Sequence, residues 1–277
     1  MHFDFKMMID RLLGRRDLLV PYFDFDKVLR NVVESAVLKD IRKLRYEVYC
    51  LECHFLDEKE YNDGQEADEY DASSIHFAAY TIDRKDIVGT VRLVQPADDQ
   101  VYPFQSHCAP FDHFVFPPRE QAAEISRLVV RKTHRRRRGD SMEGISEDFR
   151  EKGKLSDVKP KPIIGKEKRG NSPLLILGMY REMYRYSRAN GIRYWYAAME
   201  RSLAKSLEKM GFEFVPIGPQ TDYYGPVTPF IADLNDLNAR LQLENKFLAA
   251  WFNDERIPIW ILLKTLIGNM FGSSSTR

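Results

Sequence analysis

Cysteine is scarce in this sequence of 277 residues, with only Cys50, Cys53 and Cys108 present. Three thiols are too few, and odd in number, for a disulfide scaffold, and their scarcity favours a reducing compartment. No apolar run reaches the roughly 18 residues that a helix needs to span a bilayer. The opening stretch MHFDFKMMID interrupts its apolar residues with Asp4, so it does not resemble a signal peptide. These absences together predict a cytoplasmic protein.

The motifs of several well-known enzyme classes are absent as well. No glycine-rich phosphate-binding motif of the Rossmann or P-loop kind follows a predicted strand. The sequence contains neither the GxSxG nucleophile motif nor the HExxH zinc motif. Dinucleotide-dependent enzymes, P-loop NTPases, α/β-hydrolases and HExxH metalloproteases therefore find no support in it.

One short motif resembles a cofactor site. Cys50, Cys53 and His54 have the CxxCH spacing of covalent c-type haem attachment. The apolar residues around it recur every three or four positions, which is typical of a helix. Covalent haem attachment also normally follows export, and no export signal is visible. We therefore interpret the motif as two helix cysteines beside a histidine, and we predict no haem and no metal site.

Charge is distributed unevenly along the chain. Lys and Arg (42) nearly balance Asp and Glu (41) overall, and 44% hydrophobic residues indicate a globular protein with a core. Residues 131–170 nevertheless contain fourteen Lys and Arg against seven Asp and Glu, whereas residues 52–71 are acidic. The basic segment includes RRRRGD and KPKP and shows little periodicity, so we predict an insertion or loop over about 133–170.

The remaining patterns predict an α/β (α+β) protein. Helices are expected at 24–51, from Ser172 to Gly191, at 201–210 and at 236–253; strands are expected at 75–82, 87–94, 122–131, 192–199, 212–218 and 226–234. A hairpin followed by strands that alternate with helices favours a mixed sheet with helices on both faces. We expect one domain over 1–277, with a helical N-terminal lid over about 1–74 and a helical, apolar extension over about 236–277.

A series of polar and aromatic residues occurs in a distinctive order between residues 40 and 131. An Arg is followed by two aromatic residues, two Asp three apart, an Arg in a GxxRL strand, a Phe and an ExxR strand. In chain order these residues are Arg45, Tyr49, Phe55, Asp68, Asp71, Arg92, Phe104, Glu124 and Arg127. The series resembles that of the acyl-homoserine-lactone (autoinducer) synthases. The later stretch SLEKMGFEFV looks like the second half of the GNAT acyltransferase fold.

Three departures from the family pattern refine the resemblance. Tyr49 replaces the usual Phe, Phe55 replaces the usual Trp, and typical autoinducer synthases lack the basic insertion after the fourth strand. The RRRRGD element and the long chain look more like the acyltransferases found beside PEP-CTERM/exosortase gene clusters. Those proteins are relatives of the long-chain N-acyl amino acid synthases.

The resemblance implies a GNAT-type mixed central sheet flanked by helices, with a V-shaped splay between the fourth and fifth strands, here 122–131 and 192–199. It also implies an N-acyltransferase that moves a fatty acyl chain from a thioester to the amine of an amino acid or related small amine. Glu124 would be the general base and Arg127 its catalytic partner. Residues three apart on a regular strand point to opposite faces, so both can serve one site only if the strand bulges between them.

The other matched residues allow two interpretations each. By resemblance, the substrate-binding and lid residues are Arg45, Tyr49, Phe55, Asp68, Asp71, Arg92 and Phe104. The two Asp residues and Arg92 would hold the N-terminal region over the acyl and amine sites, or they would form an ordinary structural ion network. The aromatic residues of the first element would line the entrance, or they would be ordinary helix-packing residues. Glu124 itself could be a salt-bridged strand residue.

The basic insertion bears on the acyl donor. CoA-dependent GNAT proteins usually carry a Q/R-x-x-G-x-G/A loop whose amides bind pyrophosphate, and RRRRGD lacks its second glycine. Acyl carrier protein (ACP) is acidic, so a basic docking surface formed by Arg135, Arg136, Arg137 and Arg138 would attract it. We therefore predict acyl-ACP as co-substrate in preference to acyl-CoA, with no tightly bound cofactor. No nucleic-acid-binding module accompanies the basic residues, so no nucleic-acid partner is predicted.

Two other functions stay open at the level of the sequence. The chain could be an autoinducer synthase that uses S-adenosylmethionine, or a non-catalytic ACP-binding protein that has kept the fold. The segment IPIWILLKTLIGNMF near the C-terminus is too short to span a membrane. It would either make a peripheral contact with a lipid surface or pack on its own domain or a partner subunit.

Overall fold

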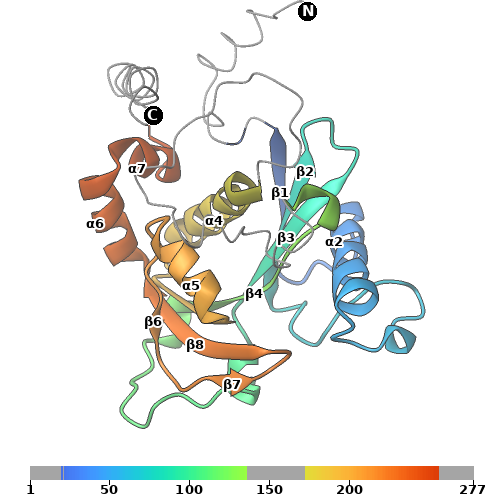
Figure 1. The fold of residues 1–277 in the computed structure, drawn as a ribbon, viewed down its shortest axis with the longest axis horizontal. Helices are drawn as coiled ribbons and strands as arrows, with labels where there is room; N and C mark the ends of the chain where they lie inside the picture. Colours follow the sequence, from blue (N-terminus) through green and yellow to red (C-terminus); the bar gives the residue numbers. More distant parts are fainter. Residues whose placement is uncertain (1–19, 21, 136–171, 256–277) are drawn as a thin grey trace, which may run out of the picture.

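The computed structural model describes residues 20, 22–135 and 172–255 of the chain. Its strands are β1 (Phe23–Val28), β2 (Ser74–Thr81), β3 (Ile87–Val94), β4 (Ala122–Val130), β5 (Tyr194–Met199), β6 (Val215–Pro216), β7 (Thr221–Asp222) and β8 (Pro226–Asp233). Its α-helices are α2 (Ala36–Tyr46), α4 (Ser172–Ala189), α5 (Arg201–Glu208), α6 (Leu234–Glu244) and α7 (Lys246–Phe252). The strands form one mixed sheet in the order β1-β2-β3-β4-β5-β8-β6, with β7 paired to β8 (Figure 1). The predicted fold class is confirmed.

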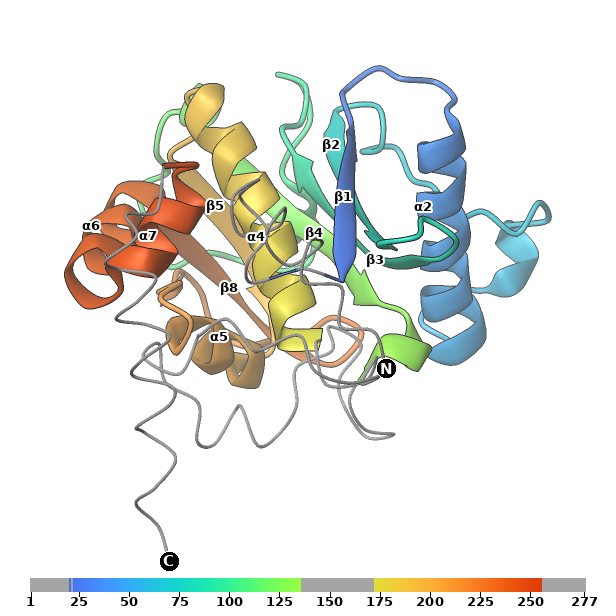
Figure 2. The same ribbon diagram turned by 90° about the horizontal axis from the view of Figure 1, so that it is seen from above.

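The sheet lies between helices on its two faces. Helix α4 covers one face of the β1–β4 half, while α2 covers the other (Figure 2). Successive side chains of a strand point to opposite faces of the sheet, so alternate residues pack against α4 and against α2. In β3, for example, Val91 and Leu93 belong to the core that includes α4, whereas Arg92 lies on the α2 side. The polar residues of the site are all on that second face.

The predicted hairpin is present as strands β2 and β3. They pair antiparallel from Ser74↔Val94 to Tyr80↔Ile87, and every residue of β3 is buried. The stretch DRKD forms the turn between them, as its polar residues predict. This central pair connects β1 at one edge to the part of the sheet that contains β4 and β5.

The helix predicted over 24–51 is wrong in its first part. Residues Phe23–Val28 form the edge strand β1, which pairs antiparallel with β2. The sequence FDFD alternates aromatic and acidic residues with the period of two that is typical of a strand. Helix α2 begins only after Ser35, whose hydroxyl accepts the N–H of Leu38 at 3.0 Å as an N-cap. The predicted lid over about 1–74 is therefore a strand, a helix and a loop in its described part.

The second half of the chain follows the predicted order with two corrections. Gly191 (φ 73°) and Gly211 (φ 95°) follow α4 and α5, where a left-handed residue ends a helix. The strand predicted over 212–218 is reduced to β6. The helix predicted over 236–253 is divided at Asn245, which leaves helical geometry and caps α7 by accepting the N–H of Leu248 at 3.0 Å.

Strands β4 and β5 separate after a short parallel contact. Ala122, Ala123 and Glu124 pair with Tyr194, Trp195 and Tyr196, but β4 continues to Val130 without pairing further with β5. Beyond Glu124 the edge of β4 that faces β5 therefore has no strand partner within the described residues. The predicted splay between these strands is confirmed.

The segments that carry two other predictions lie outside the described residues. These are most of the basic insertion, residues 136–171, and the apolar C-terminal segment, residues 256–277. Within the described part of the chain, no helix is both long and apolar enough to cross a bilayer.

Gly218 lies where the backbone after β6 closely approaches β8 and the connection between β3 and β4. An added Cβ would meet the carbonyl oxygen of Ala109 and would lie 2.8 Å from Pro229 Cγ. Backbone cannot move aside as a side chain can, so we expect Gly218→Ala to cost about 1–3 kcal/mol of unfolding free energy. Urea denaturation would measure this. Gly178→Ala, whose Cβ meets only the movable ring tip of Phe25, should cost less, and equal losses would contradict the packing.

Candidate active site

A buried carboxyl group lies where β4 and β5 separate. Glu124 is the last residue of β4 that pairs with β5, and its side chain is on the α2 side of the sheet. Only 3% of the residue is exposed, and its Oε2 accepts the backbone N–H of Phe104 at 3.0 Å. Burial raises the pKa of Glu124 to about 8, against the opposing effects of that N–H, Arg92 and Arg127. A carboxyl group with this pKa can exchange a proton near neutral pH.

Strand β4 bulges at Arg127, just beyond the regular pairing of Glu124, Ile125 and Ser126 with β3, so the irregularity that the shared site requires is present. Along β3, Thr90 pairs with Val129 and Arg92 pairs with Ser126, so two steps on β3 oppose three on β4. Arg127 occupies the left-handed region (φ 54°), which is unusual for a residue with a side chain. The bulge turns the guanidinium of Arg127 towards the acidic loop, the segment between α2 and β2 that contains Glu66 and Asp68. This loop lies on the same face of the sheet as Glu124.

Arginines and carboxylates form one network over this face. Arg45, which is fully buried, bonds to Glu66 and, at 2.7 Å, to Asp71. The guanidinium of Arg92 binds both oxygens of Asp68, at 2.5 and 2.7 Å, and Asp71 at 2.6 Å. Arg127 binds Glu66 and Asp68, each at 3.0 Å. The network therefore joins α2, the acidic loop, β3 and β4.

The carboxylates of this network are held in their charged form. Burial by itself opposes ionisation of Glu66, but Arg45 and Arg127 outweigh it and the pKa of Glu66 is lowered. The pKa values of Asp68 and Asp71 are also lowered, against the effect of burial, mainly by Arg92 and Arg45 respectively. Paired charges of this kind are tolerated in a protein interior because each has its counterion and hydrogen bonds.

The aromatic residues of the matched series surround the polar centre. Tyr49 lies in a π-helical turn, η1 (Glu47–Glu52), and the guanidinium of Arg127 lies 5.3 Å from the centre of its ring. Phe55 lies 6.5 Å from Tyr49, ring centre to ring centre. Such π-helical turns are common at functional sites because they displace a side chain from the regular helical face.

A cluster of buried, mainly apolar residues, here called the apolar wall, lies beside Glu124 at the splay. It contains the buried residues Tyr102, Phe104, Cys108, Ala122, Tyr196 and Ile217. Phe104 is 1% exposed, and its ring centre lies 5.2 Å from that of Tyr196, the β5 residue that pairs with Glu124. A carboxyl group with a raised pKa and an apolar wall are thus adjacent.

Comparisons with known proteins agree with this geometry. Residues 44–143 match the model of the acetyltransferase (GNAT) domain. TofI, solved in a ternary complex with an inhibitor and MTA, superposes with a TM-score of 0.52 and 14% identity over 82% of this chain and 99% of its own. This protein has a GNAT fold. The splay that the resemblance implied is present after Glu124, and the bulge that a shared site requires is present at Arg127.

Two further solved structures share this GNAT fold. The AHL synthase LasI has a TM-score of 0.52 and 16% identity, covering 79% of this chain and 94% of its own. BjaI, a CoA-dependent acyl-homoserine lactone synthase solved with SAM and isopentyl-CoA, has a TM-score of 0.50 and 18% identity, covering 80% and 88%. No curated protein sequence matches the chain significantly.

The structure brings together all nine residues of the matched series. Six of them, Arg45, Tyr49, Asp68, Asp71, Arg92 and Arg127, have contacts within the network. Glu124 is near enough to Arg92 and Arg127 for their charges to oppose the rise of its pKa, Phe55 packs on Tyr49, and the N–H of Phe104 bonds to Glu124. Sequence reasoning missed Glu66, although the acidic run QEADEYD contains it.

Arg135 does not lie free on a docking surface. It is 7% exposed, its Nε donates to the carbonyl of Val130 at 2.8 Å, and its other nitrogens bind Glu52 at 2.6 and 3.1 Å. The other three predicted docking residues, Arg136, Arg137 and Arg138, lie outside the described residues. Arg135 instead attaches the end of β4 to the π-helical turn.

The CxxCH motif has no metal-site geometry. Cys50 is buried within the π-helical turn and its pKa is raised to about 11, chiefly by burial. Among the described residues, no group of three or more His, Cys, Asp or Glu side chains could hold a metal ion.

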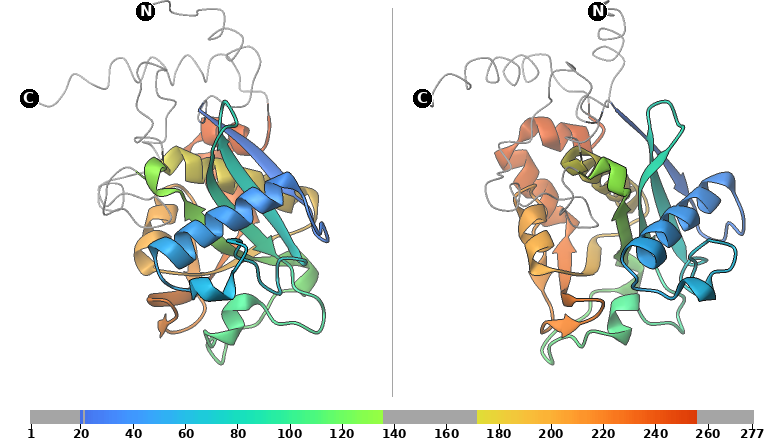
Figure 3. Two further views of the ribbon diagram at one scale, coloured as in Figure 1. Left: turned by 90° about the vertical axis from the view of Figure 1, so that its right-hand side faces the viewer. Right: turned by 45° about the vertical axis from the view of Figure 1, so that its right-hand side comes forward.

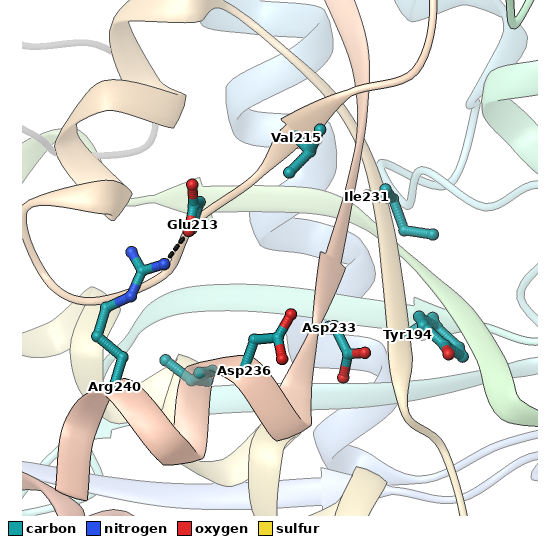
Figure 4. Close-up of a pocket in the computed structure, with 8 residues that line it drawn as sticks. Tyr194, Glu213, Val215, Ile231, Asp233, Asp236 and Arg240 are labelled. Atoms are coloured by element: carbon teal, nitrogen blue, oxygen red, sulfur yellow. Dashed lines mark hydrogen bonds and ion pairs between the residues drawn. The ribbon is translucent and has the colours of Figure 1, made fainter. Parts of the chain in front are cut away.

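A hollow on the C-terminal half of the sheet lies away from this centre. Tyr194, Ile231 and Asp233 line it from β5 and β8, and Arg240 of α6 pairs with Glu213 at its edge (Figure 4). None of the network residues lines it. The hollow is therefore separate from the ion network and from Glu124.

Glu66 is expected to be essential for the network because it bridges Arg45 and Arg127. Glu66→Gln would leave the buried guanidinium of Arg45 and the partly buried guanidinium of Arg127 without full compensation, at a cost of about 3–5 kcal/mol. Because the pKa of Glu66 is lowered on folding, its contribution is present above the ordinary carboxyl pKa and is lost as the pH falls below it. Denaturation at pH 7 and pH 4 would measure this. Glu69→Gln, at an exposed position of the same loop, should change stability little; similar losses would contradict the assignment.

Proposed function

We propose that the protein is an N-acyltransferase that moves a fatty acyl chain from the thioester of acyl-ACP to the amine of an amino acid or related small amine. The observation that carries the proposal is the buried carboxyl group of Glu124, with a pKa of about 8, at the splay of a GNAT fold. Acyl transfer to an amine needs a base of this kind because only the neutral amine is a nucleophile.

The reaction follows from the arrangement around Glu124. The ionised carboxylate accepts a proton from the acceptor's ammonium group, directly or through water. The neutral amine then attacks the thioester carbonyl, a C–N bond forms, and the C–S bond breaks to release the thiol of the carrier. Of the three protons of the ammonium group, one stays on the amide nitrogen, one protonates the departing thiolate and one passes through Glu124 to solvent. The carboxylate is thereby regenerated, and no oxidant or reductant is needed.

Two features support a donor site between β4 and β5. Beyond Glu124, the edge of β4 has no β5 partner, so its backbone groups are available to an extended pantetheine arm and to the thioester oxygen. The wall that contains Phe104 and Tyr196 is apolar and suits an acyl chain. The donor would thus lie across the splay, with its carbonyl near Glu124.

The ion network suits the acceptor side. It attaches the acidic loop to β3 and β4 through Arg92 and Arg127, directly beside Glu124. The ring of Tyr49 lies against the guanidinium of Arg127, and Phe55 packs on Tyr49. The same residues would thereby support the fold and enclose the amine, which unites the two interpretations that the sequence left open.

The alternative is an acyl-homoserine-lactone synthase that uses S-adenosylmethionine. The fold likeness to LasI and BjaI favours it. Mass spectrometry of lipid extracts from cells that express the chain separates the functions. N-acyl amino acids support our proposal, lactones support the alternative, and no new lipid, even with purified acyl-ACP and mixed amines, favours a non-catalytic ACP-binding protein.

Glu124→Gln tests the proposed base. We expect turnover to fall by about 10²–10⁴-fold, and wild-type turnover to rise with pH and level off above the Glu124 pKa of about 8. Because folding raises this pKa, ionisation costs stability as the pH rises towards 8, so the variant should be at least as stable there. Release of the carrier thiol measures the rate. Glu120→Gln, exposed just before β4, is the control; an active Glu124→Gln enzyme would exclude the role.

Replacing Arg136, Arg137 and Arg138 by serine tests the donor. If these residues attract acidic ACP, the rate with acyl-ACP should fall about tenfold at low salt and less at high salt. The rate with a short acyl-pantetheine thioester should stay unchanged, because that donor has no protein surface. Serine at Arg201 and Lys205, which are exposed on α5, is the control. An unchanged rate with acyl-ACP at low salt would refute docking through these arginines.

A further inference from the structure

The end of β4 is attached to both ends of the π-helical turn η1. The turn continues α2, and it lies beside the end of β4 in both Figure 2 and Figure 3. At the first residue of η1, Glu47 pairs with Arg131 at 3.0 Å. At its last residue, Glu52 accepts two hydrogen bonds from Arg135, at 2.6 and 3.1 Å. Two arginines four positions apart thus hold the two ends of one short turn.

The two ion pairs differ in strength. The pair of Arg131 with Glu47 is partly exposed, so water screens it and it contributes little. The side chain of Arg135 is only 6% exposed, and its bidentate bond to Glu52 is of the stronger, charge-assisted kind. Its Nε also donates to the carbonyl of Val130, the last residue of β4, at 2.8 Å. Arg135 therefore joins the backbone of β4 to the turn through three hydrogen bonds.

Between these two attachments, the turn presents Tyr49 to the same strand. The ring of Tyr49 is buried in the apolar cluster that includes Val129 of β4. The guanidinium of Arg127 lies 5.3 Å from the centre of that ring, within the range of a cation–π contact. Arg127 itself binds the acidic loop beside Glu124. The position of the ring against this guanidinium is therefore set from both ends of η1.

A π-helical turn depends on such attachments because it is a rare form of helix. Its hydrogen bonds reach one residue further than those of an α-helix: the N–H of Cys53 donates to the carbonyl of Val48 at 2.9 Å. Just beyond it, the N–H of Phe55 donates to the carbonyl of Tyr49, also at 2.9 Å. Return of this segment to an ordinary α-helix would rotate its residues about the helix axis and move the Tyr49 ring relative to Arg127.

We propose that Arg135 and Glu52 are positioning residues of the proposed active site: they hold η1 in its π-helical form and so keep the Tyr49 ring against Arg127. The inference rests on the proposed acyl transfer, in which neither side chain contacts a reacting atom. The pair acts through Tyr49 on the guanidinium that attaches the acidic loop to β4 beside Glu124.

Arg135→Lys tests the pair in the full-length chain. Lysine keeps the charge but cannot form the bidentate bond to Glu52. The donor is a short acyl-pantetheine thioester, which excludes effects on carrier docking, and the acceptor is the standard amino acid or S-adenosylmethionine that supports the highest wild-type rate. We expect kcat/KM, followed by release of thiol, to fall roughly tenfold, as for the loss of one cation–π contact.

A second measurement follows the turn itself. Hydrogen–deuterium exchange over residues 47–55 should become faster in Arg135→Lys, because the amides of Cys53 and Phe55 bond within this segment. Lys132→Gln is the matched control. Lys132 is exposed and lies 3.6 Å from Glu52 without taking part in the bidentate bond. This variant should change neither kcat/KM nor the exchange.

A Tyr49→Leu background separates positioning from general stability. With the ring already absent, Arg135→Lys should lower kcat/KM by no more than about twofold, because two changes that act through one contact are not additive. The loss of stability, measured by the midpoint of urea unfolding, should be the same in both backgrounds. A merely structural role would lower kcat/KM equally with and without the ring.

The contrary outcomes are distinct. The inference is overturned by unchanged exchange over residues 47–55 in Arg135→Lys, by an unchanged kcat/KM, or by a tenfold loss that persists in the Tyr49→Leu background. Each of these results leaves the proposed acyl transfer intact. If the wild-type chain released no thiol with any of these acceptors, the proposed function would be refuted, and the catalytic effect of the pair with it.

Discussion

The buried network of arginines and carboxylates is the interaction on which the rest of the structure depends. Without it, α2 would pack on the sheet mainly through apolar contacts, and the acidic loop between α2 and β2 would lose the ion pairs that attach it to β3 and β4 beside Glu124. Arg45 anchors the loop from the helix, and Arg92 and Arg127 anchor it from the sheet. Each charge has a counterion in a water-poor layer, so removal of one member leaves the others uncompensated.

The proposed chemistry depends on two irregularities of one strand. Separation from β5 after Glu124 opens an edge of β4, and the bulge turns Arg127 to the same side as Glu124. A regular sheet would have closed the edge and placed the two side chains on opposite faces. Burial of Glu124 under Phe104 then raises its pKa to the range in which it can act as a base. The same few residues thus shape this part of the fold and would carry out the proposed reaction.

Predictions from local patterns were correct for segments with a single hydrophobic period. They were wrong where a stretch with the strand period of two directly preceded a helix. The β2–β3 hairpin, β4, α4 and β8 follow their patterns closely. The stretch FDFD was assigned to a helix because it precedes one, although its period of two belongs to strand β1. The ordered series from Arg45 to Arg127, matched through the family resemblance, predicted residues that the structure brings together beside Glu124. Arg135 was assigned to the surface by its charge, whereas its actual partner, Glu52, is more than eighty positions away.

The sequence by itself determined the class of fold, because hydrophobic periodicity is a local property of the chain. Its resemblance to a known family predicted Glu124 and most members of the ion network, because the order of those residues along the chain is also local. Only the tertiary structure decided that Glu66 completes the network, that β4 bulges at Arg127, and that Tyr224, between β7 and β8, stacks on Phe55. These are contacts between segments that are remote in sequence. Which distant side chains meet is decided by how the sheet orders its strands, and no local pattern records that.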